Sequence, residues 1–301
     1  MIEYTYNIFG LIIRSQLEIP ELISIKSKQA HVTVQFGTTP EHLNGNISSG
    51  ILYEATEKEF LLSLPNIGNY LVRNGDEVII DPKSGASEDE IRLFLLGSVF
   101  GALLYQRGYL PLHGSAVEIA GKAIIILGNS AAGKSTLAAS LYLSGYPLIS
   151  DDLSAISVSE SGRCVILPGI SFFKLWKDSK NLLFPGKSFK QVRPQIMKYK
   201  IPVSQQSSVS KEYEIQTIVN LTTKNSSGYR VTPISGAKKL AVLREHVYRD
   251  QLIEGMGMPE FHFKMLSSIA SQVQMVHVER PSVPLQIDDL KEFFFKVIQE
   301  Y

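Results

Sequence analysis

The sequence contains little cysteine and tryptophan and carries almost no net charge. One cysteine and one tryptophan occur in 301 residues, and 30 Lys and Arg side chains offset 29 Asp and Glu side chains. A single cysteine excludes an internal disulfide framework and a cysteine-rich metal site, which fits a reducing compartment. The balanced charge argues against a nucleic-acid-binding protein, which normally carries a basic face. The length and the 44% hydrophobic content predict a globular protein with one large or two modest domains.

Long hydrophobic runs are also missing. The longest apolar region, Leu93–Leu104, is shorter than a bilayer span requires, and Arg92 and Arg107 flank it. Residues 1–16 show neither a cationic start nor a small-residue cleavage site, so we expect no signal peptide. The sequence therefore predicts a cytoplasmic protein that does not bind membranes or nucleic acid.

The first part of the chain, residues 1–86, is predicted to form a β-rich domain. Short apolar runs with period-two alternation, such as His31–Phe36 and Phe60–Leu64, are separated by turn residues. The pair Asn74-Gly75 lies between two such runs and predicts a β-hairpin.

A capping-box pattern at Ser87 and Glu90 then precedes a long apolar helix, predicted over Ile91–Arg107. We place the domain boundary there, so that a second domain occupies residues 87–301. Strands and helices alternate in this second part, and a further helix is predicted over Ala237–Leu252. The expected fold class is therefore α/β with a mixed sheet, preceded by the β-rich domain.

The most informative stretch is Gly128–Ser135, which matches the phosphate-loop (Walker A) pattern G-x-x-x-x-G-K-[ST]. A predicted buried strand, Ala123–Leu127, precedes it, and the helix-forming stretch Leu137–Leu143 follows. In such a loop the backbone N–H groups form an anion nest at a helix N-terminus. Lys134 would then contact the β- and γ-phosphates of ATP, and the Ser135 hydroxyl would hold Mg²⁺. The predicted nucleotide-binding residues are Gly128, Asn129, Ser130, Ala131, Ala132, Gly133, Lys134, Ser135 and Thr136.

Two adjacent carboxylates, Asp151 and Asp152, end the predicted strand that follows the phosphate-loop helix. Phosphoryl transfer needs a carboxylate that holds the metal or accepts the proton of the acceptor. Because adjacent residues of a strand point to opposite faces, the two aspartates could divide these roles. Upstream, Leu110–Ile119 is predicted to form a hairpin with the phosphate-loop strand through the turn Ala120-Gly121-Lys122. This hairpin brings His113 beside the nucleotide strand, where it could orient a general base.

The ordered stretches LHGSAV, GNSAAGKST and LISDD resemble the C-terminal catalytic domain of HPr kinase/phosphorylase. The resemblance implies an HPr-kinase-like P-loop domain in which Asp151 is the general base and His113 its partner. It further implies that Lys134 contacts phosphate and that Ser135 and Asp152 lie on the metal side. The chain departs from that family at Ala131, where glycine is usual, and at PGISFFKLWKD, which stands in place of a glycine-rich acidic motif.

A second resemblance covers nearly the whole chain. The stretches FGLIIRSQLEIPEL, PGISFFKLWKDS and AVLREHVYRDQLIEGMG are similar to HPr-kinase-related proteins encoded with lasso-peptide biosynthetic enzymes. This resemblance implies an ATP-dependent serine kinase in the biosynthesis of a ribosomally made peptide. Its expected partner is a precursor peptide that offers a serine acceptor, typically at the C-terminus. The sequence leaves the oligomeric state open, and a homo-oligomer is compatible with it.

A basic and aromatic region follows the double aspartate. Its cations could bind a peptide carboxylate or a nucleotide, whereas its large aromatics, Trp176, Phe172 and Phe173, are expected in the core. Arg244 or Arg249 could supply a further cation to the transferring phosphoryl group. The cations of the region are Lys174, Lys177, Lys180, Lys187, Lys190, Arg193, Lys198 and Lys200.

Together these features predict an ATP- and Mg²⁺-dependent kinase that transfers a phosphoryl group to a serine hydroxyl. Three alternatives remain open from the sequence. The chain could be an HPr(Ser) kinase that acts on a carrier protein, or a kinase of a small-molecule alcohol. It could also be a nucleotide-binding switch without transfer activity, although such a switch has no need for a general base.

Overall fold

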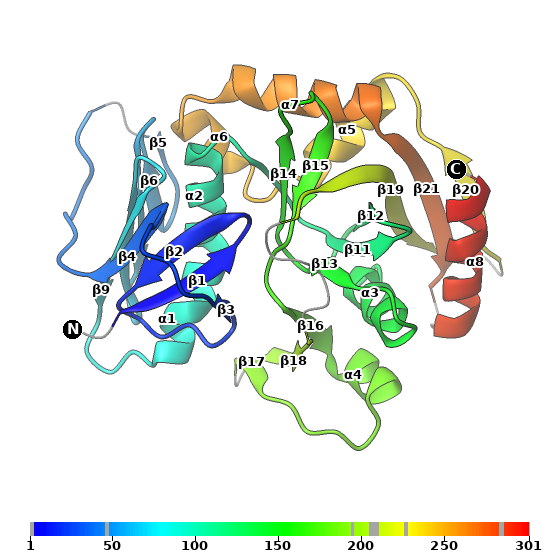
Figure 1. Ribbon diagram of the computed structural model, residues 1–301, viewed down its shortest axis with the longest axis horizontal. Coiled ribbons are helices and arrows are strands. Elements are labelled where there is room, and N and C mark those ends of the chain that lie inside the picture. The colour runs from blue at the N-terminus through cyan, green and yellow to red at the C-terminus, as the bar shows by residue number, and fades with distance from the viewer. Residues whose placement is uncertain are drawn as a thin grey trace. The chain divides into compact units, whose positions relative to one another are not determined.

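The computed structural model describes residues 3–45, 48–193, 196–204, 211–225, 228–282 and 286–300. The chain divides into two compact units, each made of two segments (Figure 1). The first unit comprises Met1–Pro111 and Tyr248–Lys264, and the second comprises Leu112–Val247 and Met265–Tyr301. The expected boundary at residues 86/87 therefore lies inside the first unit. Its helix and a returning segment belong with the β-rich part.

The first unit contains a nine-stranded sheet in the order β3-β1-β2-β4-β9-β8-β7-β6-β5. The pairs β2–β4 and β4–β9 are parallel, and the others are antiparallel. Asn74 and Gly75 have φ values of 49° and 69° in the turn between β8 and β9, which confirms the predicted hairpin. The strands are β1 (Tyr4–Ile8), β2 (Leu11–Ser15), β3 (Ile23–Ser24), β4 (Val32–Phe36), β5 (Ser48–Ser49), β6 (Tyr53–Ala55), β7 (Glu59–Leu64), β8 (Gly68–Arg73) and β9 (Glu77–Pro82).

A helical segment packs in the same unit. The Ser87 side chain accepts a hydrogen bond from the backbone N–H of Glu90, so the predicted capping box is present. The predicted continuous helix is instead built from α1 (Glu88–Phe94), a π-helical segment (Leu95–Val99) and α2 (Phe100–Gln106). The buried Tyr70 of β8 donates its hydroxyl to the Ile91 carbonyl at 3.1 Å, which ties this segment to the sheet.

The second unit is built on a mixed sheet, as the sequence predicts. Strands β14, β15, β19, β12, β11 and β13 neighbour one another in this order, and β21 pairs with both β19 and β20. The pairs β12–β19 and β19–β21 are parallel, whereas β11–β12 is an antiparallel hairpin. The strands are β10 (Leu110–Leu112), β11 (Ser115–Ile119), β12 (Lys122–Leu127), β13 (Leu148–Ser150), β14 (Ser154–Val158), β15 (Cys164–Leu167), β19 (Tyr213–Lys224), β20 (Arg230–Pro233) and β21 (Gln274–Pro281).

Helices α3 (Lys134–Leu143) and α8 (Ile287–Glu300) pack side by side against this sheet (Figure 1). Their apolar side chains, such as Leu137 and Phe294, share one buried cluster with Ile124 and Ile126 of β12. A small sheet in the order β16-β18-β17, with α4, packs beside α3. Its elements are β16 (Phe172–Trp176), α4 (Lys177–Leu183), β17 (Gln191–Arg193) and β18 (Ile196–Pro202).

The remaining helices are α5 (Ala237–Glu245), α6 (Gln251–Gly255) and α7 (Pro259–Gln272). The single helix predicted over Ala237–Leu252 is wrong, because the chain leaves the helix at His246. There the His246 carbonyl accepts the His113 N–H at 2.7 Å, and Val247 bridges Leu112. Among the helices that the structure describes, none is long and apolar enough to span a membrane.

Candidate active site

The phosphate loop joins the end of β12 to the start of α3. Gly128, Ala131 and Gly133 have φ values of 143°, 64° and 107°, which aim the loop amides inward. A Cβ at Gly128 would lie 2.1 Å from the carbonyl oxygen of Leu221 on the parallel neighbour β19. Only glycine fits both this φ and this close approach. The predicted strand–loop–helix geometry is thus present, with the nest at the N-terminus of α3.

Lys134 lies over this nest. Its side chain is buried, and its Nζ donates to the carbonyls of Gly128 at 2.6 Å and Asn129 at 3.2 Å. Burial lowers the pKa of the Lys134 ammonium. Behind it, the Thr136 and Ser179 hydroxyls hydrogen-bond at 2.8 Å and connect α3 to α4. The lysine is therefore held at the loop by carbonyls that a phosphate oxygen can replace as its partners.

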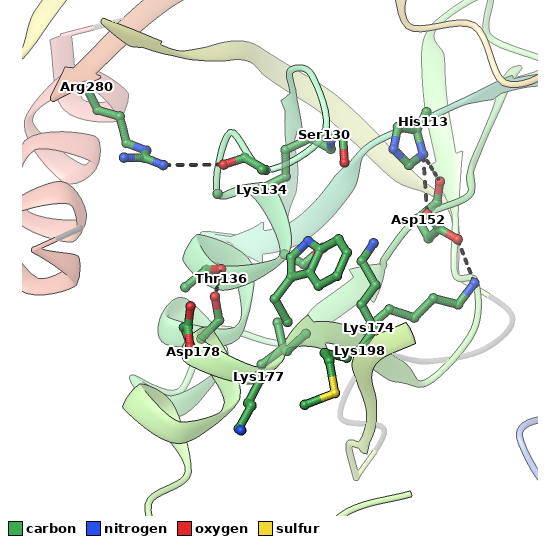
Figure 2. Close-up of a pocket in the computed structure, with 17 residues that line it drawn as sticks. His113, Ser130, Lys134, Thr136, Asp152, Lys174, Lys177, Asp178, Lys198 and Arg280 are labelled. Carbon is green, nitrogen blue, oxygen red and sulfur yellow. Dashed lines mark hydrogen bonds and ion pairs between the residues drawn. The ribbon is translucent and has the colours of Figure 1, made fainter. Parts of the chain in front are cut away.

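A cavity of about 480 Å³ opens at the loop, within the range of about 300–1,000 Å³ typical of ligand sites (Figure 2). Of the predicted site residues, those that line it are His113, Ser130, Ala131, Gly133, Lys134, Ser135, Thr136 and Asp152. Gly128, Asn129 and Ala132 build the loop behind the lining. Asp151, predicted as the general base, does not line the cavity.

Asp151 is buried below the cavity floor, with 3% of its surface exposed. Its Oδ1 accepts the Ser115 hydroxyl at 2.6 Å, and its Oδ2 accepts the Lys174 backbone N–H at 3.1 Å. Burial raises its pKa, while hydrogen bonds from Ser115, Lys174 and Ser135 oppose the rise. This carboxylate bonds to the Ser135 side chain, and it is not among the residues that line the cavity.

Asp152, which was predicted on the metal side, is the carboxylate of the pair that lines the cavity. Its Oδ2 accepts the Lys174 ammonium at 2.6 Å, and its Oδ1 lies 3.4 Å from the Nδ1 of His113 (Figure 2). That Nδ1 is also 3.0 Å from the Asp152 carbonyl oxygen, so His113 partners Asp152 rather than Asp151. Burial raises the pKa of Asp152, but the charges of Lys174 and His113 outweigh it and bring the pKa down to about 2. Burial lowers the pKa of His113.

The backbone at Asp152 is unusual as well, with a φ of 72°. A left-handed conformation at a non-glycine residue costs free energy and persists where the surroundings enforce it, often at functional sites. Here it turns the second carboxylate of the pair into the cavity while the first stays buried. Asp152 therefore faces the cavity, whereas Asp151 does not line it.

Two residues that line the cavity differ from what the sequence predicts. Arg280, at the end of β21, was not singled out by any motif; its Nε donates to the Ala132 carbonyl at 2.8 Å. Trp176 was expected in the core, but 43% of its surface is exposed and it lines the cavity, whereas Phe172 and Phe173 are buried as predicted. Neither Arg244 nor Arg249 lines the cavity. Its cations are Lys134, Lys174, Lys177, Lys198 and Arg280.

The donor set fits a hard divalent cation bound together with a nucleotide. Such ions take oxygen ligands, and Mg²⁺ usually binds through one or two protein groups plus substrate phosphates. The Ser135 hydroxyl lines the cavity and bonds to the buried Asp151 carboxylate, which orients its lone pairs. Within the described ranges, no three His, Cys, Asp or Glu side chains gather as a metal site. Ser135, with Asp151 or Asp152 beside it, would therefore hold Mg²⁺ through the phosphates.

No family model matches the chain, and no curated protein matches it in sequence. Among solved structures, the HPr(Ser) kinase/phosphatase from Coxiella burnetii is similar at 12% sequence identity, with a TM-score of 0.32. The match covers 63% of this chain and 94% of that chain.

Proposed function

We propose that the protein is an ATP- and Mg²⁺-dependent kinase that phosphorylates a hydroxyl group. One observation carries this proposal: the phosphate nest and the ionised Asp152 open into the same cavity. A nest alone would suit a nucleotide-binding switch. A carboxylate held at the mouth of the nest by His113 and Lys174 adds a group that can receive a hydroxyl proton.

The donor side follows from the loop. Its amides and the N-terminus of α3 bind phosphate oxygens, and Lys134 exchanges its carbonyl partners for the β- and γ-phosphates. Arg280 holds the loop through the carbonyls of Ala132 and Ala131. When bound, Mg²⁺ would supply charge neutralisation for the phosphates, and Ser135 with Asp151 is the pair that would position it.

The acceptor side follows from Asp152. An acceptor hydroxyl in the cavity donates a hydrogen bond to this carboxylate, and its oxygen attacks the γ-phosphorus. One P–O bond forms, the bond between the γ-phosphorus and the β,γ-bridging oxygen breaks, and ADP leaves. Asp152 receives the hydroxyl proton, while Lys174 and His113 keep its carboxylate ionised and oriented until then. Positioning of this kind provides most of the catalysis in phosphoryl transfer.

For the acceptor we propose a serine hydroxyl, as at the C-terminus of a lasso-type precursor peptide. The second sequence resemblance supports this choice. The cations Lys174 and Lys198 beside Asp152 support it further, because a peptide carboxylate next to the reacting hydroxyl would meet positive charge there. A precursor peptide is accordingly the proposed partner.

The test is mass spectrometry after incubation with Mg²⁺, ATP and synthetic peptides that end in serine. The wild-type protein should add one phosphoryl group to the terminal serine, and the same peptide with a terminal alanine should stay unmodified. Asp152→Asn should slow transfer by about 10²–10⁴-fold, the usual contribution of a positioned base, with little change in nucleotide affinity.

Asp178→Asn is the matched control, because Asp178 also lines the cavity but lies in the first turn of helix α4. It should retain transfer. Equal losses of transfer in the two variants would contradict the role of Asp152. Nucleotide binding without modification of any peptide would favour the switch instead.

A further inference from the structure

Five cationic side chains line the cavity, and the contacts described above account for the positions of only some of them. Lys134 is engaged by loop carbonyls, Lys174 by Asp152, and Arg280 by the Ala132 carbonyl. Lys177 extends away from the other labelled cations (Figure 2). The phosphate loop therefore accounts for the positions of Lys134 and Arg280, and Asp152 accounts for that of Lys174. Lys177 does not join the other cations. Lys198 needs a different explanation.

Lys198 is held by an aromatic ring. It lies on β18 directly opposite Trp176 of β16, and its ammonium is 4.8 Å from the centroid of the Trp176 ring. An aromatic face attracts and orients a cation but carries no net charge. A carboxylate partner, in contrast, would cancel the charge of the lysine. The β16–β18 pair thus fixes the position of this cation, and among the described residues no carboxylate forms an ion pair with it.

Lys198 lies in the cavity that contains both the phosphate loop and Asp152. It lines the same cavity as Lys134 and Asp152. After burial and the nearer charges, its ammonium also lowers the pKa of both of these groups, which places it within electrostatic reach of each. A phosphoryl group in transfer passes between the phosphate nest and Asp152, and its charge is stabilised by cations positioned there.

We infer that Lys198, oriented by Trp176, is a catalytic residue that contacts the transferring phosphoryl group and stabilises its charge in the transition state. This inference rests on the proposed kinase function and adds a residue that no phosphate-loop motif contains. It also gives Trp176 a role as a positioning residue, which accounts for an exposed aromatic at the mouth of the site.

The test measures binding of a transition-state analogue and needs no acceptor. Magnesium ADP is titrated with and without aluminium fluoride, which mimics the transferring phosphoryl group, and binding is followed by calorimetry. Trp176 is the only tryptophan in the sequence, so its fluorescence reports the same events in the wild-type protein. Aluminium fluoride should tighten ADP binding to the wild-type protein, and Lys198→Gln should remove about 10²-fold of that tightening while affinity for ADP alone is kept. Lys198→Arg, which keeps the charge, should keep most of it.

Lys200→Gln is the matched control. Lys200 lies two residues further along β18, is similarly half-buried, and lies 5.6 Å from the Phe172 ring centroid, but it does not line the cavity. It should leave the tightening unchanged. Equal losses with and without aluminium fluoride in Lys198→Gln would overturn the inference, as would wild-type binding of ADP that aluminium fluoride does not tighten. Failure of the wild-type protein to bind ADP at all would instead refute the proposed function, and the inference with it.

Discussion

Replacing Gly128 with alanine should destabilise the second unit and disable the phosphate loop. The glycine has a φ of 143°, a region that alanine enters only at a cost of about 1–3 kcal/mol. The new Cβ would also lie 2.1 Å from the Leu221 carbonyl oxygen. Because an ordinary carbon–oxygen contact is about 3.3 Å or longer, β12 and β19 must separate by about 1 Å. Overpacking of this kind adds about 1–3 kcal/mol, so the expected loss in free energy of unfolding is about 2–6 kcal/mol.

Gly121→Ala is the control that isolates the close approach. Gly121 lies in the two-residue turn between β11 and β12 with a φ of 81°, and no heavy atom lies within 4 Å of its ideal Cβ. It should cost only the backbone strain, about 1–2 kcal/mol. Its distance from the nest should leave nucleotide affinity unchanged.

The assay is urea denaturation followed through Trp176, which lies in the second unit and therefore reports its unfolding. Circular dichroism on the same samples checks whether the two probes coincide. Magnesium ADP is then titrated against the folded variants, and Gly128→Ala should bind at least tenfold more weakly than Gly121→Ala. If the two variants have equal denaturation midpoints and equal affinities, the conformation argued for the loop is incorrect.

Two further predictions concern groups around the cavity. Arg280→Lys removes the guanidinium fork that bonds to the Ala132 and Pro281 carbonyls, and it should weaken magnesium ADP binding about tenfold in calorimetry; the exposed Arg230→Lys should not. His246 is buried, and burial lowers its pKa, so the unfolded chain binds its proton more readily than the folded chain. The contribution of neutral His246 to the free energy of unfolding should therefore be complete above about pH 6.5, the pKa of histidine in the unfolded chain. The free energy of unfolding should fall as the pH drops below that value. His246→Gln should flatten this slope in urea titrations between about pH 7 and 5, and an unchanged slope would contradict the assignment.

Local features of the chain were readable from the sequence because neighbouring residues decide them. The Asn74-Gly75 turn needs two positive φ values, and the capping box at Ser87 needs one side chain three residues on. Likewise, the Gly128–Ser135 loop joins a buried strand to a helix in the predicted order. The glycine positions of this loop could be predicted because few other residues adopt their backbone angles.

The division of labour between Asp151 and Asp152 was not readable in the same way. Strand alternation predicts that adjacent carboxylates diverge, but it does not say which of them meets the cavity. The answer depends on groups contributed by other elements. The Ser115 hydroxyl donates a hydrogen bond to the buried Asp151 carboxylate. Lys174 and His113 contact the Asp152 carboxylate at the cavity. These partners are 22 to 39 residues away in the chain, so no local pattern records them.

By itself, the sequence determined the phosphate loop, the mixed α/β class and the presence of a carboxylate pair, since short-range backbone preferences and hydrophobic periodicity encode them. Only the tertiary structure decided that Arg280 supports a loop almost 150 residues earlier and that Trp176 faces the cavity opposite Lys198. Alternation along β16 buries Phe173 and Leu175 and turns Trp176 to the other face, where the pairing register with β18 selects its cation. The two strands are separated in the chain by α4 and β17, so no local pattern in the sequence records this register.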